Sequence, residues 1–150
     1  MTLEISPGKS GEKPKIFMVG LGGTIAAKEI DDKWHYGHFT QKELLNLDQN
    51  IKKNFDVSMS NLFRLDSADT QPEHWLSLAN LIYSKLDAGF DGIVVTHGTD
   101  TMHYSSSVLS FLIQDLNIPI VFTGSQILPT QFGSDASRNL FDSLIVASFA

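Results

Sequence analysis

The stretch IFMVGLGGT, residues 16–24, decides how the chain folds. Its first four residues, Ile16 to Val19, form an apolar run typical of a strand buried on both faces. The glycines that follow predict a tight turn, and Thr24 is the first residue after it with a reactive side chain. We therefore expect the folded part of the chain to begin with a buried strand and a glycine turn.

Similar apolar runs recur along the sequence, and segments with helical spacing separate them. The runs predict further strands at residues 57–65, 92–96 and 118–122. Helical spacing predicts a helix that starts near Pro72 and stops before Gly89, and two more at residues 103–116 and 137–150. A short helix is expected at residues 40–47, where Thr40 and Glu43 have capping-box spacing, and a long loop is expected at residues 28–40.

This order of strands and helices defines the expected fold class. Strands and helices alternate, and the strands are continuously apolar rather than alternately apolar and polar. Such strands are covered on both faces, which favours an α/β fold with a doubly wound, mainly parallel sheet.

The composition is that of an ordinary globular domain. The 150 residues are 42% hydrophobic, and the formal net charge is -6. Basic residues are scattered except between Lys9 and Lys15, so neither nucleic acid nor a membrane is an expected partner. The absence of cysteine excludes disulfides, thiol catalysis and cysteine-ligated zinc. The sequence has no signal-peptide core and no run of ~18 apolar residues, so the expected location is cytoplasmic.

The two ends of the sequence differ from its body. Residues 1–14 are polar, contain glycine and proline, and are expected to form a flexible tail. Residues 15–150 are expected to form one domain. The sequence stops at VASFA, residues 146–150, within a predicted helix and without a cap, so we expect a longer protein to continue beyond it.

Four loops at the carboxyl ends of the predicted strands are the expected place for chemistry, because ligands of doubly wound sheets bind there. All four contain small, hydroxyl-bearing or acidic residues. They are GLGGT at 20–24, DSAD at 66–69, THGTDT at 96–101 and TGSQ at 123–126. Together they offer hydroxyl nucleophiles, a carboxylate and glycine-exposed backbone N–H groups, which are the parts of an acyl-transfer site.

The glycine turn also has other interpretations. A dinucleotide fingerprint GxGxxG would need glycine at position 25, where Ile25 stands, and the lysine of a P-loop is missing. From this segment alone, a tight turn with Thr24 capping a helix remains open. No serine stands in a GxSxG elbow, so a Ser-His-Asp arrangement is not predicted.

Other polar residues have structural interpretations as well. Thr99 and Asp100 could cap the helix that follows them, and His97 is more simply a packed histidine at a strand end. His35 and His38 have no third ligand near them in the sequence, so we expect a solvated loop and no metal site there.

Two of the loops, taken together, resemble a known family. GGTIA at residues 22–26 and THGTDTM at residues 96–102 are similar to the two signature motifs of the L-asparaginase family. The resemblance covers about residues 15–150 and is to the cytosolic type I branch. Further similar stretches are DSADTQPEHW at 66–75, YSSSVLSFLIQ at 104–114, PIVFTGSQ at 119–126 and GSDASRNL at 133–140.

The resemblance implies a fold, a reaction and catalytic residues. The fold is a flavodoxin-like N-terminal domain followed by a smaller C-terminal domain. The reaction is hydrolysis of L-asparagine to L-aspartate and ammonia through an acyl-enzyme, without a cofactor. Thr24 corresponds to the nucleophile, and Thr99 and Asp100 belong to a second catalytic group. Tyr36 is the candidate for the tyrosine that polarises the nucleophile.

The same resemblance implies substrate-binding residues and an assembly. Ser67 and Asp100 correspond to the residues that hold the α-carboxylate and α-amino groups, with Gly23, Gly98 and Ala68 as further candidates. Family members are homo-oligomers in which a neighbouring subunit completes each site. A family lysine should follow position 150, and the last lysine here is Lys85. We therefore expect the isolated 150 residues to fold but to be inactive or very weak.

Two alternative functions stay open. The family includes a component of an archaeal tRNA-dependent amidotransferase that releases ammonia from glutamine. That component carries an extra domain before its GGTIA motif, whereas few residues precede Gly22 here, which disfavours it. Glutamine hydrolysis as a side activity is harder to exclude, because one methylene contributes only ~1–3 kcal/mol of discrimination. The second alternative is a non-catalytic asparagine-binding or regulatory module.

Overall fold

The opening apolar run forms a buried strand, as predicted, and this strand is one of the two inner strands of the sheet. In the computed structural model, which describes residues 12–149, strand β1 covers Lys15–Gly22 and is buried from its second residue onward. It pairs with β4 on one side and β5 on the other, and both pairings are parallel. The predicted flexible tail, residues 1–14, lies mostly outside the described residues.

The sheet has four parallel strands in the order β4-β1-β5-β6. Strand β4 covers Asp56–Leu65, β5 covers Gly92–Thr96 and β6 covers Ile120–Thr123. The chain runs from β1 to β4 at one edge and then crosses to β5 on the other side of β1. The point where the strand order reverses, between β1 and β5, is where ligands bind in doubly wound folds. The predicted fold class is confirmed.

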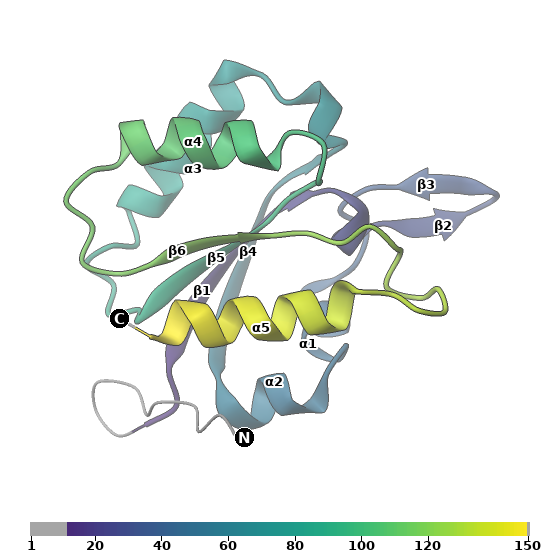
Figure 1. Cartoon of the computed structure of the whole chain (residues 1–150), viewed down its shortest axis with the longest axis horizontal. Helices are drawn as coiled ribbons and strands as arrows, with labels where there is room; N and C mark the ends of the chain where they lie inside the picture. Colours follow the sequence, from purple (N-terminus) through teal and green to yellow (C-terminus); the bar gives the residue numbers. More distant parts are fainter. Residues whose placement is uncertain (1–11, 150) are drawn as a thin grey trace.

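Helices cover both faces of the sheet (Figure 1). Helices α3, Pro72–Tyr83, and α4, Met102–Leu112, pack on one face over residues such as Phe17 and Val19. Helices α1, Gln41–Leu45, α2, Gln49–Asn54, and α5, Ala136–Ser148, pack on the other face over Ile16 and Met18. Neighbouring residues of β1 thus point into two separate cores, which explains the continuous apolar run.

Several predicted boundaries differ from the structure. Helix α3 ends at Tyr83, because the next residues make tight turns such as Lys85 N–H to Ile82 O. Helix α4 ends at Leu112, before Asp115 with its positive φ of 58°. Strand β6 starts after Pro119, which has no N–H for a sheet ladder. Helix α2 was not predicted, because its six residues include only one buried apolar side chain.

The predicted long loop at residues 28–40 is wrong in its first half. Strands β2, Lys28–Ile30, and β3, Lys33–His35, pair antiparallel in a hairpin that projects from the body (Figure 1). The two residues between them, Asp31 and Asp32, both have positive φ, 51° and 57°, as a type I′ turn requires. The hairpin is largely exposed, so it lacks the apolar alternation by which a strand is recognised in a sequence.

The base of the hairpin is tied to helix α1. The predicted capping box is present: Glu43 N–H donates to Thr40 Oγ1, and Thr40 N–H donates to Glu43 Oε2 over 2.8 Å. The Lys28 ammonium donates to the other Glu43 oxygen over 2.6 Å. These bonds lower the pKa of Glu43 to about 2, with the Lys28 bond as the largest cause. Glu43 therefore joins the hairpin to the helix through one carboxylate.

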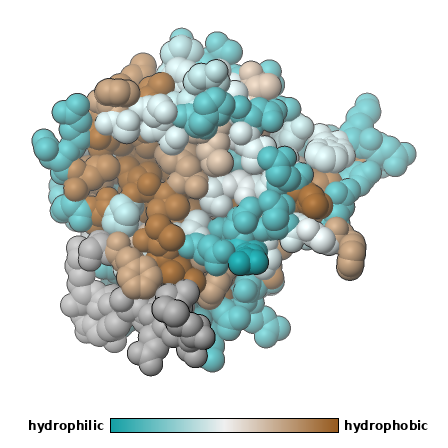
Figure 2. Space-filling view, in the orientation of Figure 1, coloured by the Kyte–Doolittle hydropathy of each residue, from teal (hydrophilic) through white to brown (hydrophobic). Residues whose placement is uncertain are grey.

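Strand β6 is the edge of the sheet within the described residues, and its surroundings are apolar. Figure 2 shows apolar residues gathered where β6 runs between α4 and α5. A groove of about 210 Å³ lies between α4 and β6, lined by residues such as Leu109, Leu116 and Phe122. None of the described helices has the length and apolar character that a membrane crossing requires.

Candidate functional site

A small polar cavity lies where β1, β4 and β5 end. Its volume is about 50 Å³, and it is open to solvent. Loops from all three strands and the residue after the β2–β3 hairpin contribute to it. The lining residues are Gly23, Thr24, Tyr36, Asp66, Ser67, Gly98, Thr99 and Asp100. Three of the four loops predicted to converge therefore do so at the switch point of the sheet.

Glycines allow these loops to approach one another. A Cβ atom on Gly98 would lie 2.5 Å from Ser67 Oγ, and one on Gly23 would overlap the backbone of Gly98. Gly23 also has a φ of 72°, which disfavours other residues. Thr101 strengthens the contact, because its hydroxyl donates to the Ser67 carbonyl over 2.8 Å. The loops after β1, β4 and β5 thus pack as one unit.

The fourth loop lies beneath the cavity rather than in its wall. A Cβ atom on Gly124 would lie 2.6 Å from the His97 carbonyl and 3.2 Å from Thr99 Cγ2. The Asn139 amide holds this loop by donating to the Gly124 carbonyl over 2.9 Å. The loop after β6 therefore packs against the segment that contains Thr99, on the side away from the cavity.

Hydrogen bonding separates the hydroxyls of these loops into two groups. Those of Thr96, Thr101, Thr123 and Ser125 donate to backbone carbonyls. In the part of the chain that the structure describes, the hydroxyls of Thr24, Ser67 and Thr99 have no such partner and line the cavity. No fully buried side-chain polar atom among the described residues lacks a partner, so these three hydroxyls reach solvent. They are available to a ligand.

The capping interpretations of Thr24, Thr99 and Asp100 are not supported. The turn that follows Gly23 is a 3-10 helix of three residues, Thr24–Ala26, whose N-cap is Gly23 itself. The N-cap of α4 is Thr101, without a side-chain cap bond. A pyrophosphate site needs the N-terminus of a full helix after the glycine turn, so the short 3-10 turn also argues against dinucleotide binding.

Two carboxylates lie near the Tyr36 hydroxyl. The pKa of Tyr36 is raised above 10.0, first by burial and then by the nearby carboxylates of Asp66 and Asp100. Asp66 also caps the 3-10 turn Ser67–Asp69, where its Oδ1 accepts from Ala68 N–H over 3.1 Å. The tyrosine therefore keeps its proton at neutral pH.

The structure brings together all but one of the catalytic and substrate-binding candidates that the family resemblance assigned. Ala68 is the exception: it is exposed, does not line the cavity, and its amide is used by Asp66. Asp66 is the residue that the sequence reasoning did not assign. Its only signal was its position, directly after a strand and directly before Ser67.

Histidines do not contribute to the cavity wall. His97 is only 2% exposed and is hydrogen-bonded on both ring nitrogens, as a packed histidine would be. His35 and His38 stack edge to face with ring centroids 5.2 Å apart. Across residues 12–149, no three His, Cys, Asp or Glu side chains gather as a metal ion would require.

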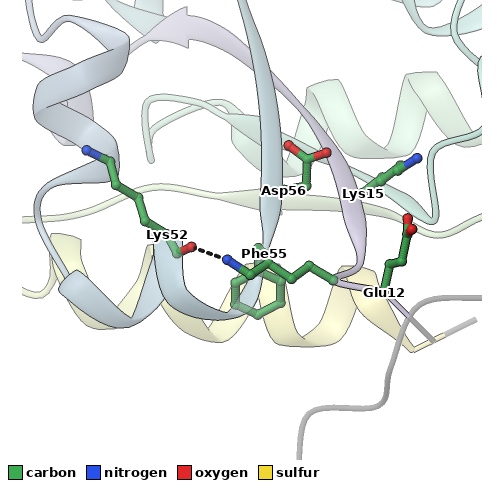
Figure 3. A pocket seen from close by; sticks show the side chains of 6 residues that line it. Glu12, Lys15, Lys52, Phe55 and Asp56 are labelled. Atoms are coloured by element: carbon green, nitrogen blue, oxygen red, sulfur yellow. Dashed lines mark hydrogen bonds between the residues drawn. The ribbon is translucent and has the colours of Figure 1, made fainter. Parts of the chain in front are cut away.

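A larger hollow of about 390 Å³ lies at the opposite end of the sheet, where β1 and β4 begin (Figure 3). Its lining has charged side chains and Phe55, and Lys13 donates to the Lys52 carbonyl across it over 3.0 Å. None of the described residues that line it offers a hydroxyl nucleophile. The polar cavity at the carboxyl ends of the strands is therefore the better candidate for chemistry.

The fold and the cavity define an α/β protein in which two threonine hydroxyls at the switch point of a parallel sheet have no hydrogen-bond partner among residues 12–149. The family model described as "Asparaginase, N-terminal" matches residues 15–150, and the chain belongs to this family. The family belongs to the amidohydrolase class of enzymes.

Relatives carry two different names. The chain is 37% identical to a component of the glutamyl-tRNA(Gln) amidotransferase of Thermofilum pendens, over 92% of this chain and 31% of that protein. It is similar to the L-asparaginase structure from Thermococcus kodakarensis, with 36% identity, a TM-score of 0.77, and coverage of 89% and 40%. The probable cytoplasmic L-asparaginase from Campylobacter jejuni gives 31% identity and a TM-score of 0.80, over 88% and 41%. The chain thus spans about a third of the curated relatives' length.

Proposed function

We propose that this chain carries the nucleophile-bearing half of an L-asparaginase that hydrolyses L-asparagine to L-aspartate and ammonia. The observation that carries the proposal is the cavity itself. Thr24 and Thr99 line it with hydroxyls that no other described residue binds, and Asp66 and Asp100 line it as well. Its volume of about 50 Å³ is far below the ~300 Å³ or more of cofactor and drug-sized pockets, and its lining is almost entirely polar.

The proposed chemistry begins at Thr24. Its Oγ1 attacks the side-chain amide carbon of asparagine, and the hydroxyl proton passes to the leaving nitrogen, which departs as ammonia. The resulting acyl-enzyme is then hydrolysed by water, which releases aspartate and restores the threonine. Backbone N–H groups of the glycine-rich loops receive the negative charge on the amide oxygen, and each well-placed donor contributes about 3–4 kcal/mol.

A threonine hydroxyl is a weak nucleophile at neutral pH and needs a polarising partner. Tyr36 lines the same cavity as Thr24, and burial and the nearby carboxylates keep its hydroxyl protonated. We therefore assign the Tyr36 oxygen as the acceptor that polarises the Thr24 hydroxyl. Asp100 and Ser67 would hold the substrate ammonium and carboxylate, and Thr99 would act with a lysine that the family resemblance assigns to a region beyond residue 150.

The whole protein is proposed to be a cytoplasmic homo-oligomer with a small-molecule substrate and residues 15–150 as its N-terminal domain. The experiment measures ammonia release from L-asparagine by the 150-residue chain and by the whole gene product. We expect turnover from the whole product and little or none from the 150 residues. If neither releases ammonia while L-asparagine still binds, the chain is a binding module and the assignment to Thr24 fails.

A second candidate, glutamine hydrolysis within a tRNA-dependent amidotransferase, is favoured by the names of several relatives at 35–38% identity. The two amides differ by one methylene, which a pocket discriminates by only ~1–3 kcal/mol. The same assay with L-glutamine separates the candidates. A higher kcat/KM for L-glutamine than for L-asparagine would favour the amidotransferase.

A further inference from the structure

A buried chain of hydrogen bonds ends at the backbone of the candidate site. Trp75 Nε1 lies 2.8 Å from Ser105 Oγ, and Ser105 Oγ lies 2.8 Å from His97 Nε2. The other ring nitrogen, His97 Nδ1, lies 2.8 Å from the Gly98 carbonyl oxygen. Ser105 is fully buried and His97 is 2% exposed. We call Trp75, Ser105 and His97 the buried relay; it links α3 and α4 to the loop after β5.

The partners fix the direction of every bond in the relay. The indole Nε1–H of Trp75 can only donate, so it donates to Ser105 Oγ. The Gly98 carbonyl can only accept, so His97 carries its proton on Nδ1. His97 Nε2 is then the acceptor for the Ser105 hydroxyl. Burial lowers the pKa of His97, against the opposing effect of its Gly98 bond, so the ring stays neutral and keeps this pattern at neutral pH.

The last bond of the relay sets the orientation of one peptide unit. A trans peptide is planar, and its C=O and N–H point in opposite directions. Because the Gly98 carbonyl points to the buried His97 ring, the N–H of Thr99 points away from His97. Among the described residues this N–H has no hydrogen-bond partner, and both Gly98 and Thr99 line the cavity.

We propose that the buried relay positions the Gly98–Thr99 peptide so that the Thr99 N–H donates to the substrate's amide oxygen as negative charge develops there. This inference rests on the proposed amide hydrolysis. Trp75, Ser105 and His97 are positioning residues, because none of them lines the cavity. The relay places no charge near the reacting atoms and acts only through the orientation of one backbone donor.

The structure also argues against a relay that only fills the core. A buried polar network adds nothing to stability that well-packed apolar side chains could not supply, and each unpaired member is destabilising. The neighbours of His97 include the Phe122 ring, at 6.1 Å between centroids, so an apolar side chain would suit this environment. An apolar side chain could make neither of the two hydrogen bonds of the ring, and of these the bond to Gly98 is the one that reaches the backbone of the site.

The first test compares two substitutions of His97 in the whole gene product. In His97→Asn the side-chain amide can replace the Nδ1 donor to Gly98, whereas in His97→Gln it reaches toward Ser105 and leaves the Gly98 carbonyl unpaired. We expect His97→Gln to lower kcat/KM for L-asparagine about 10- to 100-fold, as loss of positioning does. His97→Asn should retain clearly more activity at a similar melting temperature.

The second test separates positioning from general stability. Ser105→Ala removes the centre of the relay, and Ser143→Ala removes another buried helical hydroxyl, which is bonded to Leu140 O in α5. We expect only Ser105→Ala to lower kcat, with melting temperatures compared for both variants. Equal activity of the two variants, or equal losses in His97→Asn and His97→Gln, would overturn the proposal.

A third measurement does not depend on turnover. Side-chain ¹⁵N NMR of His97 should show the neutral ring protonated at Nδ1, and in His97→Gln the backbone amide signals of Thr99 and Asp100 should shift more than in His97→Asn. If the unsubstituted protein hydrolyses no amide, the proposed function fails, while these spectra still test the positioning. A ring protonated at Nε2 or unshifted Thr99 signals would reject the relay.

Discussion

Gly23 and Gly98 touch backbone to backbone: a Cβ atom on Gly23 would overlap the Cα and N of Gly98 and lie 2.7 Å from the His97 carbonyl carbon. This contact joins the loop that carries Thr24 to the loop that carries Thr99. The distance between the two hydroxyls is therefore set by two residues without side chains. The spacing of the site therefore depends on this close packing, because a movement of either loop away from the other would separate Thr24 from Thr99.

Gly23→Ala should disrupt both stability and activity. The φ of Gly23, 72°, and the overlap with Gly98 act together, and we expect a loss of about 3 kcal/mol in unfolding free energy. Gly89→Ala is the matched control, since Gly89 has a φ of 79° and nothing within 4 Å of its Cβ position. It should lose only about 1 kcal/mol and keep its activity. Urea unfolding measures the stability of both variants, and ammonia release measures their activity. Equal losses in Gly23→Ala and Gly89→Ala would show that the close contact with Gly98 is unimportant.

Thr24→Val should abolish hydrolysis without destabilising the fold. The Thr24 hydroxyl has no hydrogen-bond partner among residues 12–149, so valine removes the proposed nucleophile and no structural bond. We expect kcat to fall by at least about 10³-fold with an unchanged melting temperature. In the control Thr123→Val, a bond to the Asn139 carbonyl is lost, so stability should fall by about 1 kcal/mol while hydrolysis continues. Retained hydrolysis in Thr24→Val would exclude Thr24 as nucleophile.

Asp66→Asn should lower the pKa of Tyr36. Burial is the largest cause of the raised pKa, and the nearby Asp66 carboxylate adds to the effect, which the substitution removes. The folded pKa lies above the unfolded value, so the contribution to stability is present below pH 10.0 and is lost as the pH rises beyond it. NMR titration of Tyr36 measures the shift. Asp69→Asn, in the same turn but outside the cavity, should leave the Tyr36 titration unchanged.

His97 should make the protein less stable in mild acid. Its folded pKa lies below the unfolded value of 6.5, so the unfolded state binds the proton first as the pH falls. The stability that neutral His97 supplies is complete above pH 6.5 and decreases by about 1 kcal/mol per pH unit below it, down to the folded pKa. Urea unfolding between pH 7.5 and 5.5 should therefore show a steeper loss for the unsubstituted protein than for His97→Asn. Parallel curves would contradict this.

The order of strands and helices was readable because it depends on local patterns. Continuous apolar runs such as residues 92–96 correspond to buried parallel strands, and Thr40 with Glu43 indicated the start of α1. Segments without such patterns were missed. The β2–β3 hairpin is mostly exposed, and α2 buries only Ile51, so neither leaves a periodic apolar signal.

The sequence by itself determined the strand-and-loop framework and the resemblance to one family, because both reside in short contiguous motifs. Tertiary structure decided which hydroxyls are available. The Thr101 hydroxyl donates to the carbonyl of Ser67, 34 residues away, and the Thr123 hydroxyl donates to the Asn139 carbonyl. The hydroxyls of Thr24 and Thr99 have no such partner in the described chain. It also brought Asp66 to Tyr36 and His97 to Ser105. These pairings depend on how parallel strands align in space, and residue type and spacing alone do not encode that alignment.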